Sequence, residues 1–172
     1  MHFAPSDALP RPAAPDAPVL VVDDHPLTRA LLQRLLGLDG IETIAAGTLD
    51  QAQRILEQTL PALIVLDLRL PDGDGLELAQ RRKSDPATSA GAIIACSAGT
   101  ASEDRSRAAQ AGCDAYVSKP IDIWSFAQLV AELTGHPSSA RPGPPMTPAR
   151  RPAAPRARSG ASPPASARAG RP

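Results

Sequence analysis

Carboxylates that directly follow apolar runs are the residues of this sequence best placed to do chemistry. The apolar run 63–66 leads straight into Asp67. A second apolar run, 19–22, ends in the adjacent pair Asp23 and Asp24. Short continuous apolar runs are typical of buried parallel strands, and open α/β sheets bind ligands outside the carboxyl ends of such strands. We therefore expect the three carboxylates to meet in one pocket at that edge of a sheet.

A hydroxyl and an ammonium group follow two later apolar runs. Ser97 comes directly after the run 91–96, and Lys119 comes shortly after the run 114–117. Clustered carboxylates repel one another unless a cation joins them, and short oxygen ligands favour Mg²⁺. Such an ion would let the Asp67 carboxylate attack a phosphoryl group and form an aspartyl phosphate. Ser97 and Lys119 could then hold the phosphoryl oxygens.

The elements that would position these residues alternate along the chain. Strand-like apolar runs cover 18–22, 41–45, 62–66, 91–96 and 114–117. Helical patterns cover 26–38, 49–59, 74–83, 101–111 and 122–134. Five βα units in series predict an α/β fold, a doubly wound five-stranded parallel sheet with helices on both faces. The order of the strands cannot be derived from one sequence.

Local signals mark the ends of several of these helices. Pro26 suits the first turn of a helix, where its missing N–H costs nothing. Thr48 with Gln51, and Thr100 with Glu103, have the spacing of capping boxes. Glycines near three helix ends are expected to take left-handed backbone conformations. These glycines are Gly37, Gly112 and Gly135.

The composition divides the chain into three parts. Residues 1–15 hold four prolines, and residues 136–172 hold ten prolines and seven arginines but no acidic side chain. Such segments bury too little apolar surface to offset the entropy of ordering them. We therefore expect a disordered N-terminal extension and a disordered basic tail rich in Pro, Ala and Arg. The remaining residues, 16–135, have the length of one ordinary domain.

The charge is distributed unevenly, although the chain as a whole has a formal net charge of zero. Residues 16–135 carry 10 basic and 17 acidic side chains, whereas the tail is only basic. A basic tail can steer toward nucleic acid or acidic lipid. Its arginines are spread thinly with no aromatic residues between them, so we favour a solubilising tail over nucleic-acid binding.

The cysteines and the apolar runs bear on the compartment. Two isolated cysteines do not make a disulfide framework and suit a reducing compartment. The N-terminus lacks the pattern of a signal peptide, and no apolar run approaches the roughly 18 residues that span a bilayer. We therefore expect a cytoplasmic protein that does not associate with a membrane.

Four segments of the chain resemble the sequence motifs of one known family. They are VLVVDDHP, LIVLDLRLPDGDG, IIACSAG and DAYVSKPI, in that order. Ser97 lies 30 residues after Asp67, and Lys119 lies 22 residues after Ser97, which also fits the family pattern. Residues 18–134 are therefore similar to the receiver domain of bacterial two-component response regulators, which has a flavodoxin-like fold.

The resemblance implies a role for each residue of the pocket. Asp67 would accept a phosphoryl group from a sensor histidine kinase or a histidine phosphotransfer protein. Asp24 and Asp67 would bind Mg²⁺ directly, and Asp23 would act through a water molecule. The backbone carbonyl of Arg69 would be a further ligand. The Arg69 side chain would lie at the mouth of the site, where it would affect the lifetime of the phosphate.

The resemblance also implies a switch. Ser97 would move toward the phosphoryl group, Tyr116 would swing inward behind it, and Lys119 would pair with the phosphoryl oxygens. The bond between Lys119 and Pro120 is often cis in this family. The segment 112–126 resembles the stand-alone regulators of cell-cycle kinases and cell division more than the DNA-binding kind.

We therefore expect a phosphorylation-controlled signalling module, and no enzyme beyond promotion of its own phosphotransfer and slow dephosphorylation. Phosphate on Asp67 would shift a conformational equilibrium and alter contacts with an unidentified protein partner, because residues 136–172 cannot fold into a DNA-binding domain.

Two alternatives remain open. A Mg²⁺-dependent aspartyl-phosphate phosphohydrolase is disfavoured because Arg69 stands where such enzymes carry a second acid. A receiver-like binding module that is never phosphorylated is disfavoured by the complete set of acidic, hydroxyl and lysine side chains.

Overall fold

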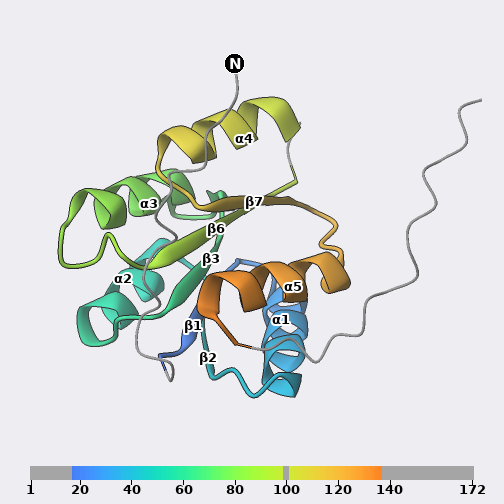
Figure 1. The fold of residues 1–172 in the computed structure, drawn as a ribbon. Helices are drawn as coiled ribbons and strands as arrows, with labels where there is room; N and C mark the ends of the chain where they lie inside the picture. Colours follow the sequence, from blue (N-terminus) through green and yellow to red (C-terminus); the bar gives the residue numbers. More distant parts are fainter. Residues whose placement is uncertain (1–16, 99–100, 137–172) are drawn as a thin grey trace, which may run out of the picture.

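The computed structural model describes residues 17–98 and 101–136 (Figure 1). The strands of the main sheet are β1 (Val19–Val22), β2 (Thr43–Ala46), β3 (Leu63–Asp67), β6 (Ala92–Ser97) and β7 (Ala115–Ser118). A separate short hairpin consists of β4 (Arg69–Leu70) and β5 (Gly73–Asp74). The helices are α1 (Pro26–Leu38), α2 (Leu49–Gln58), α3 (Gly75–Ser84), α4 (Ala101–Gln110) and α5 (Ile123–Thr134). Within the described ranges, no helix is both long enough and apolar enough to cross a membrane.

The main sheet formed by the described residues has the order β2-β1-β3-β6-β7, and every neighbouring pair of strands is parallel. This confirms the predicted α/β fold with a five-stranded, doubly wound parallel sheet. The strand β2 begins at Thr43, two residues later than predicted, because the N–H of Ile41 bonds to the carbonyl of Leu36 at the end of α1. Because the strands are parallel, their carboxyl ends meet at one edge of the sheet.

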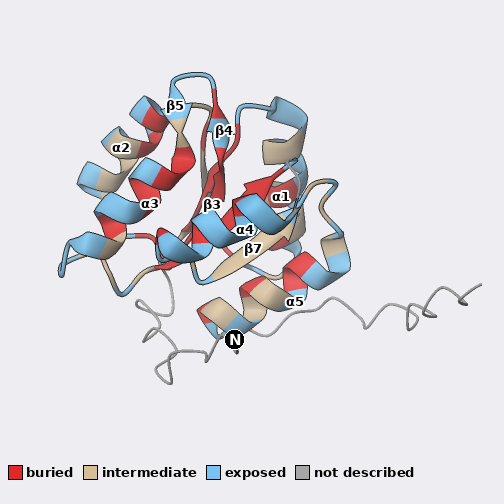
Figure 2. Cartoon of the chain, turned by 90° about the horizontal axis from the view of Figure 1, so that it is seen from above, coloured by how far each residue is buried: buried red, intermediate tan, exposed pale blue. Residues whose placement is uncertain are grey.

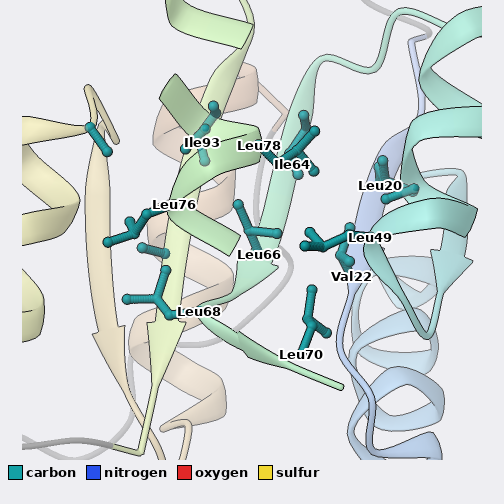
Figure 3. Close-up of a cluster of buried hydrophobic side chains, with 14 of the residues drawn as sticks. Leu20, Val22, Leu49, Ile64, Leu66, Leu68, Leu70, Leu76, Leu78 and Ile93 are labelled. Atoms are coloured by element: carbon teal, nitrogen blue, oxygen red, sulfur yellow. The ribbon is translucent and has the colours of Figure 1, made fainter. Parts of the chain in front are cut away.

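Each face of the sheet has its own buried cluster, since alternate side chains of a strand point to opposite faces. On one face, Leu20, Ile64 and Ile93 pack with residues of α2, α3 and α4 (Figure 3). On the other face, Val21 packs in a cluster with Phe126 of α5 and residues of α1. In Figure 2 the buried residues lie toward the sheet and the exposed residues on the outer sides of the helices. Burial on both faces explains why the three central strands, β1, β3 and β6, read as continuous apolar runs.

The start of α2 follows the predicted cap with one difference. The Oγ of Thr48 accepts a hydrogen bond from the backbone N–H of Gln51 at 3.2 Å, as predicted. The side-chain oxygen of Gln51 accepts from the N–H of Gly47 at 2.8 Å, whereas a capping box would have it accept from Thr48 itself. The predicted cap at Thr100 lies outside the described residues, as do the predictions for residues 1–15 and for the tail beyond His136.

Two of the three predicted left-handed glycines are found. Gly112 and Gly135 have φ angles of 84° and 73°. The prediction for Gly37 is wrong, since α1 continues through it to Leu38. The chain turns back toward β2 only after that point, and Gly40 takes the left-handed conformation there, with φ 75°.

The hairpin of β4 and β5 was not predicted, and its acidic residues hold two helix ends. The carboxylate of Asp72 accepts hydrogen bonds from the backbone N–H groups of Leu49 and Asp50, at the start of α2. These bonds hold the pKa of Asp72 below its usual value of 3.8. Asp74 caps α3, because its Oδ1 accepts from the N–H of Leu76 at 2.9 Å.

Candidate functional site

Three carboxylates meet at the carboxyl edge of the sheet. Asp23 and Asp24 follow β1, and Asp67 is the last residue of the neighbouring strand β3. One carboxylate oxygen from each lies within 4.8 Å of the other two. Asp23 and Asp67 are buried, with exposed fractions of 3% and 5%, whereas Asp24 is exposed. The structure thus brings together the three acids grouped from the sequence, two of them buried and one exposed.

Short-range hydrogen bonds hold the two buried carboxylates. Oδ1 of Asp23 accepts from the backbone N–H of His25, and Oδ1 of Asp67 accepts from the backbone N–H of Arg69, both at 2.9 Å. Each is the local turn in which an aspartate bonds to the backbone two residues on. The guanidinium of Arg29 in α1 donates to the backbone carbonyl of Asp23 at 2.6 Å. The loops that carry the carboxylates are therefore fixed by their own backbone and by α1.

The ammonium group of Lys119 bridges the two buried carboxylates. Its Nζ donates hydrogen bonds to Oδ2 of Asp23 at 2.7 Å and to Oδ2 of Asp67 at 2.5 Å. Burial alone would lower the pKa of Lys119, but the hydrogen bonds and charges of the two carboxylates outweigh it and raise this pKa above 10.5. The backbone N–H of Lys119 bonds to the carbonyl of Ser97, and the peptide bond between Lys119 and Pro120 is cis.

The donor atoms of this acid cluster suit a hard divalent cation. All are carboxylate oxygens, the ligands that Mg²⁺ prefers. One ammonium group does not balance three carboxylates, so the excess negative charge favours a further cation. Arg69 lies beside the cluster, since its backbone N–H bonds to Asp67. The residues present therefore fit the ion that was expected from the sequence.

The hydroxyl of Ser97 is bound to a side chain that the sequence analysis missed. Ser97 is the last residue of β6 and is fully buried. Its Oγ donates a hydrogen bond of 2.5 Å to Oδ2 of Asp104, which lies in α4. Asp104 is itself buried, with an exposed fraction of 9%. The structure therefore adds a fourth acid beside the three that follow β1 and β3.

A sequence signal for Asp104 exists in the pattern of α4. Asp104, Ala108 and Ala111 are all buried, at the spacing of one helix face. An acid on the apolar stripe of a helix needs a polar partner in the core, because an unpaired buried carboxylate is costly. The identity of that partner depends on the packing of α4 against β6, which the local sequence does not contain.

Tyr116 lies in β7 and is half-buried. The guanidinium carbon of Arg105 in α4 lies 5.7 Å from the centre of its ring, within the range of a cation–π contact. Its hydroxyl oxygen is buried and has no hydrogen-bond partner among the residues that the structure describes. The ring of Tyr116 therefore joins β7 to α4 through Arg105.

The chain is similar to known proteins over the same part that forms this fold. The family model of the response regulator receiver domain matches residues 19–131. An uncharacterized 14.6 kDa protein from Leptolyngbya boryana is 37% identical over 66% of this chain and 87% of its own length. The polar-differentiation response regulator DivK of Brucella ovis is 32% identical over 68% of this chain and 95% of its own length. The crystal structure of a response regulator receiver protein from Pseudomonas putida superposes with a TM-score of 0.64 at 28% identity, covering 70% of this chain and 99% of that one.

A parallel sheet of this order, with an acid cluster and a lysine at its carboxyl edge, defines a class of phosphoacceptor modules. The chain belongs to the response regulator receiver domain family of two-component signalling. Members of this family are phosphoacceptors and bind Mg²⁺ in an acidic pocket. They interact with histidine kinases or phosphotransfer proteins.

Proposed function

We propose that Asp67 of this chain accepts a phosphoryl group from a sensor histidine kinase or a histidine phosphotransfer protein. The observation that carries the proposal is the environment of the Asp67 carboxylate. One oxygen is held by the backbone N–H of Arg69 and the other by the ammonium group of Lys119. The carboxylate is therefore oriented, and a positive charge stands beside it, before a phosphoryl donor arrives.

The transfer step conserves atoms and electrons. A carboxylate oxygen of Asp67 forms a bond to phosphorus, while the bond from phosphorus to the imidazole nitrogen of the donor breaks. The electron pair of the broken bond stays on the imidazole nitrogen, which takes up a proton. The product is an acyl phosphate on Asp67, and no oxidant or reductant takes part.

The other residues of the pocket support this step through their charges and hydrogen bonds. Lys119 turns from the carboxylate toward a phosphoryl oxygen, and the Ser97 hydroxyl donates to another. Asp24 and Asp67, with the backbone carbonyl of Arg69, would hold Mg²⁺ directly, and Asp23 would hold it through water. Such an ion would supply positive charge that offsets the repulsion between the Asp67 carboxylate and the incoming phosphoryl group.

Phosphorylation then shifts an existing equilibrium between two conformations of β6, α4, β7 and α5. Tyr116 takes part by moving inward as Ser97 moves toward the phosphoryl group. This role is supported by the half-buried position of Tyr116 and by its hydroxyl, which has no hydrogen-bond partner in the described part of the chain. The altered surface contacts a protein partner, as expected of a regulator similar to one named for polar differentiation.

The proposal also covers the bounds of the domain, the extent of catalysis and the compartment. Residues 16–135 form the receiver unit, and residues 1–15 and 136–172 are extensions outside it. The chain catalyses no turnover beyond its own phosphotransfer and slow dephosphorylation. It acts in the cytoplasm, where the proposed phosphoryl donors take their phosphate from ATP.

The proposal is tested with acetyl phosphate as a small phosphoryl donor. The full chain is incubated with and without Mg²⁺, and its intact mass is measured for the wild type and for Asp67→Asn. We expect the wild type to gain one phosphoryl group only with Mg²⁺, and the variant to gain none. The variant keeps the size of the side chain and removes the attacking oxygen, so it isolates the acceptor.

Two other results would change the assignment. Binding of Mg²⁺ without a phosphoryl adduct would favour a binding module that is not phosphorylated. Steady release of inorganic phosphate over many turnovers would favour a phosphohydrolase, in spite of Arg69 at the position of the second acid.

A further inference from the structure

The Ser97 hydroxyl donates its proton to Asp104 in the structure and to a phosphoryl oxygen in the proposed phosphorylated state. A serine hydroxyl carries one proton and donates one hydrogen bond at a time. In the structure Ser97 gives that bond to Oδ2 of Asp104, at 2.5 Å. In the proposed phosphorylated state, it gives the bond to a phosphoryl oxygen on Asp67. Asp104 and the phosphoryl group therefore compete for the same proton.

Asp104 is held in place independently of Ser97. Its side chain is only 12% exposed, and the guanidinium groups of Arg69 and Arg107 each lie 3.8 Å from one of its oxygens. Arg107 also donates a short hydrogen bond to Asp74, which ties α4 to the end of β5. When the serine hydroxyl turns away, the Asp104 carboxylate keeps two cationic neighbours. It does not become an uncompensated buried charge, so both arrangements of the hydroxyl are accessible.

We infer that Asp104 is a positioning residue of the acceptor site, which retains the Ser97 hydroxyl until a phosphoryl oxygen competes for it. The inference rests on the proposed function of Asp67 and Ser97. Asp104 touches no reacting atom and acts through Ser97 alone. Asp104 lies in α4, so it also couples the movement of the Ser97 hydroxyl to that helix. The hydrogen bond between Ser97 in β6 and Asp104 in α4 breaks when Ser97 donates to the phosphoryl oxygen instead.

The hydrogen bond between Ser97 and Asp104 therefore lowers the affinity of the site for phosphoryl groups. A hydrogen bond to a charged partner is stronger than one between neutral groups. The unphosphorylated state therefore gains from the Asp104 bond, and the phosphorylated state forfeits it. Removal of the Asp104 carboxylate should shift the balance toward the phosphorylated arrangement.

The test measures the affinity of the full chain for beryllofluoride in the presence of Mg²⁺, by isothermal titration calorimetry. Beryllofluoride binds a carboxylate without a covalent phosphoryl transfer and mimics the acyl phosphate. We expect Asp104→Ala to bind it about tenfold more tightly than the wild type, the lower end of the effect of a charged hydrogen bond. Glu103→Ala is the matched control, since Glu103 is an exposed acid on the same turn of α4, and it should leave the affinity unchanged.

The decisive measurement repeats the substitution without the serine hydroxyl. If Asp104 acts through Ser97, Asp104→Ala should have no effect on affinity in a Ser97→Ala background. The substitution also frees Arg69, whose guanidinium could attract the anion directly. That effect would persist in the Ser97→Ala background, so the comparison separates the two mechanisms.

Asp104→Asn is a second variant, chosen to preserve the structure of α4. Asp104→Asn keeps the shape of the side chain and an oxygen that accepts a hydrogen bond, but it removes the charge. We expect its affinity to lie between those of the wild type and Asp104→Ala. Circular dichroism of each variant establishes that it is folded before titration.

Three outcomes would overturn the inference. The first is an unchanged affinity in folded Asp104→Asn and Asp104→Ala, and the second is an equal gain with and without the Ser97 hydroxyl. The third is a wild type that binds no beryllofluoride and gains no phosphoryl group from acetyl phosphate, which also overturns the proposed function. In the first two outcomes the wild type still binds, so the proposed function stands while the role of Asp104 does not.

Discussion

The two halves of the site hold their functional side chains in different ways. In the half formed by β1 and β3, here called the acid half, backbone N–H groups and Lys119 fix the carboxylates of Asp23 and Asp67. In the half formed by β6, α4 and β7, the switch half, Ser97 is bonded to a side chain of α4. Tyr116 in this half has a buried hydroxyl without a partner in the described ranges.

The acid half and the switch half meet two different requirements of a phosphorylation switch. Electrostatic stabilisation of a phosphoryl group needs charges whose positions are set in advance. A conformational response needs an element with two arrangements of similar free energy. In the acid half, backbone contacts over short sequence distances set the positions of the charged groups in advance. In the switch half, exchangeable side-chain contacts allow two arrangements of similar free energy.

The largest effect on stability should come from the packing beneath the acid half. Leu66 is fully buried in β3, directly before Asp67, and Leu66→Ala leaves a cavity that should lower the free energy of unfolding by about 3 kcal/mol. Urea unfolding measures this difference. Leu27→Ala is the control, since Leu27 is 72% exposed and should change stability by less than about 0.5 kcal/mol. Equal effects of the two substitutions would contradict a rigid acid half.

A smaller effect, with a distinctive response to Mg²⁺, should follow from Lys119→Ala. Loss of the ammonium group leaves Asp23 and Asp67 facing each other, and we expect the free energy of unfolding to fall by about 2 kcal/mol. Addition of Mg²⁺ should restore part of the loss, because the cation replaces the missing positive charge. Thermal unfolding with and without millimolar Mg²⁺ measures both quantities.

The control for this response is an ion pair of similar partial exposure at the other edge of the sheet. Lys83 bonds to Asp114 at 2.9 Å, and Asp114 directly precedes the start of β7, whereas Lys119 follows its end. Lys83→Ala should also destabilise the protein, but Mg²⁺ should not restore its stability any more than that of the wild type. A similar rescue of both variants would show that the effect of Mg²⁺ is not local to the acid half.

Acid should weaken two helix caps, one at the start of α2 and one at the start of α5. Hydrogen bonds from backbone N–H groups lower the pKa of Asp72, and bonds from Ser125 and Trp124 lower that of Asp122. A lowered pKa means that the folded state binds fewer protons than the unfolded state, so its contribution is present above the unfolded pKa and is lost as pH falls through the folded pKa. We expect the melting temperatures of Asp72→Asn and Asp122→Asn to depend less on pH than that of the wild type, between about pH 5 and pH 2.

The two capping carboxylates, Asp72 and Asp122, differ in the elements that they connect. The cap by Asp72 joins the hairpin of β4 and β5 to α2, whereas the cap by Asp122 lies within its own helix start, at α5. Identical pH profiles for the wild type and both variants would mean that neither carboxylate contributes to stability.

The smallest effect should come from Tyr116→Phe in the switch half. The hydroxyl is buried without a partner among residues 17–98 and 101–136, so its removal should leave stability unchanged or raise it by up to about 1 kcal/mol. Tyr116→Ala, which also removes the ring over which Arg105 lies, should instead lower stability. A clear loss of stability in Tyr116→Phe would show that the hydroxyl has a favourable interaction in the folded protein.

Much of the acid half could be predicted because its information is local. Apolar runs buried on both faces mark β1 and β3, and the residues that follow such runs must lie at the carboxyl edge of a parallel sheet. The grouping of Asp23, Asp24 and Asp67 follows from those two facts once the strands are parallel. The five-stranded sheet and its two helical layers follow from the same alternation.

The features that were missed depend on packing between distant segments. Asp104 meets Ser97 only when α4 packs on the sheet, and Asp72 reaches the N–H groups of α2 from 22 and 23 residues away. Gly37 and Gly40 are three residues apart, and the turn toward β2 decides which of them takes the left-handed conformation. Neither local propensity nor periodicity contains these contacts.

The position of Lys119 in the chain has a consequence for newly made protein. It lies 96 residues after Asp23 and 52 residues after Asp67. At synthesis rates of about 5–20 residues per second, the ribosome makes Lys119 some 3–10 seconds after Asp67. A nascent chain therefore carries its acids well before the ammonium group that bridges them.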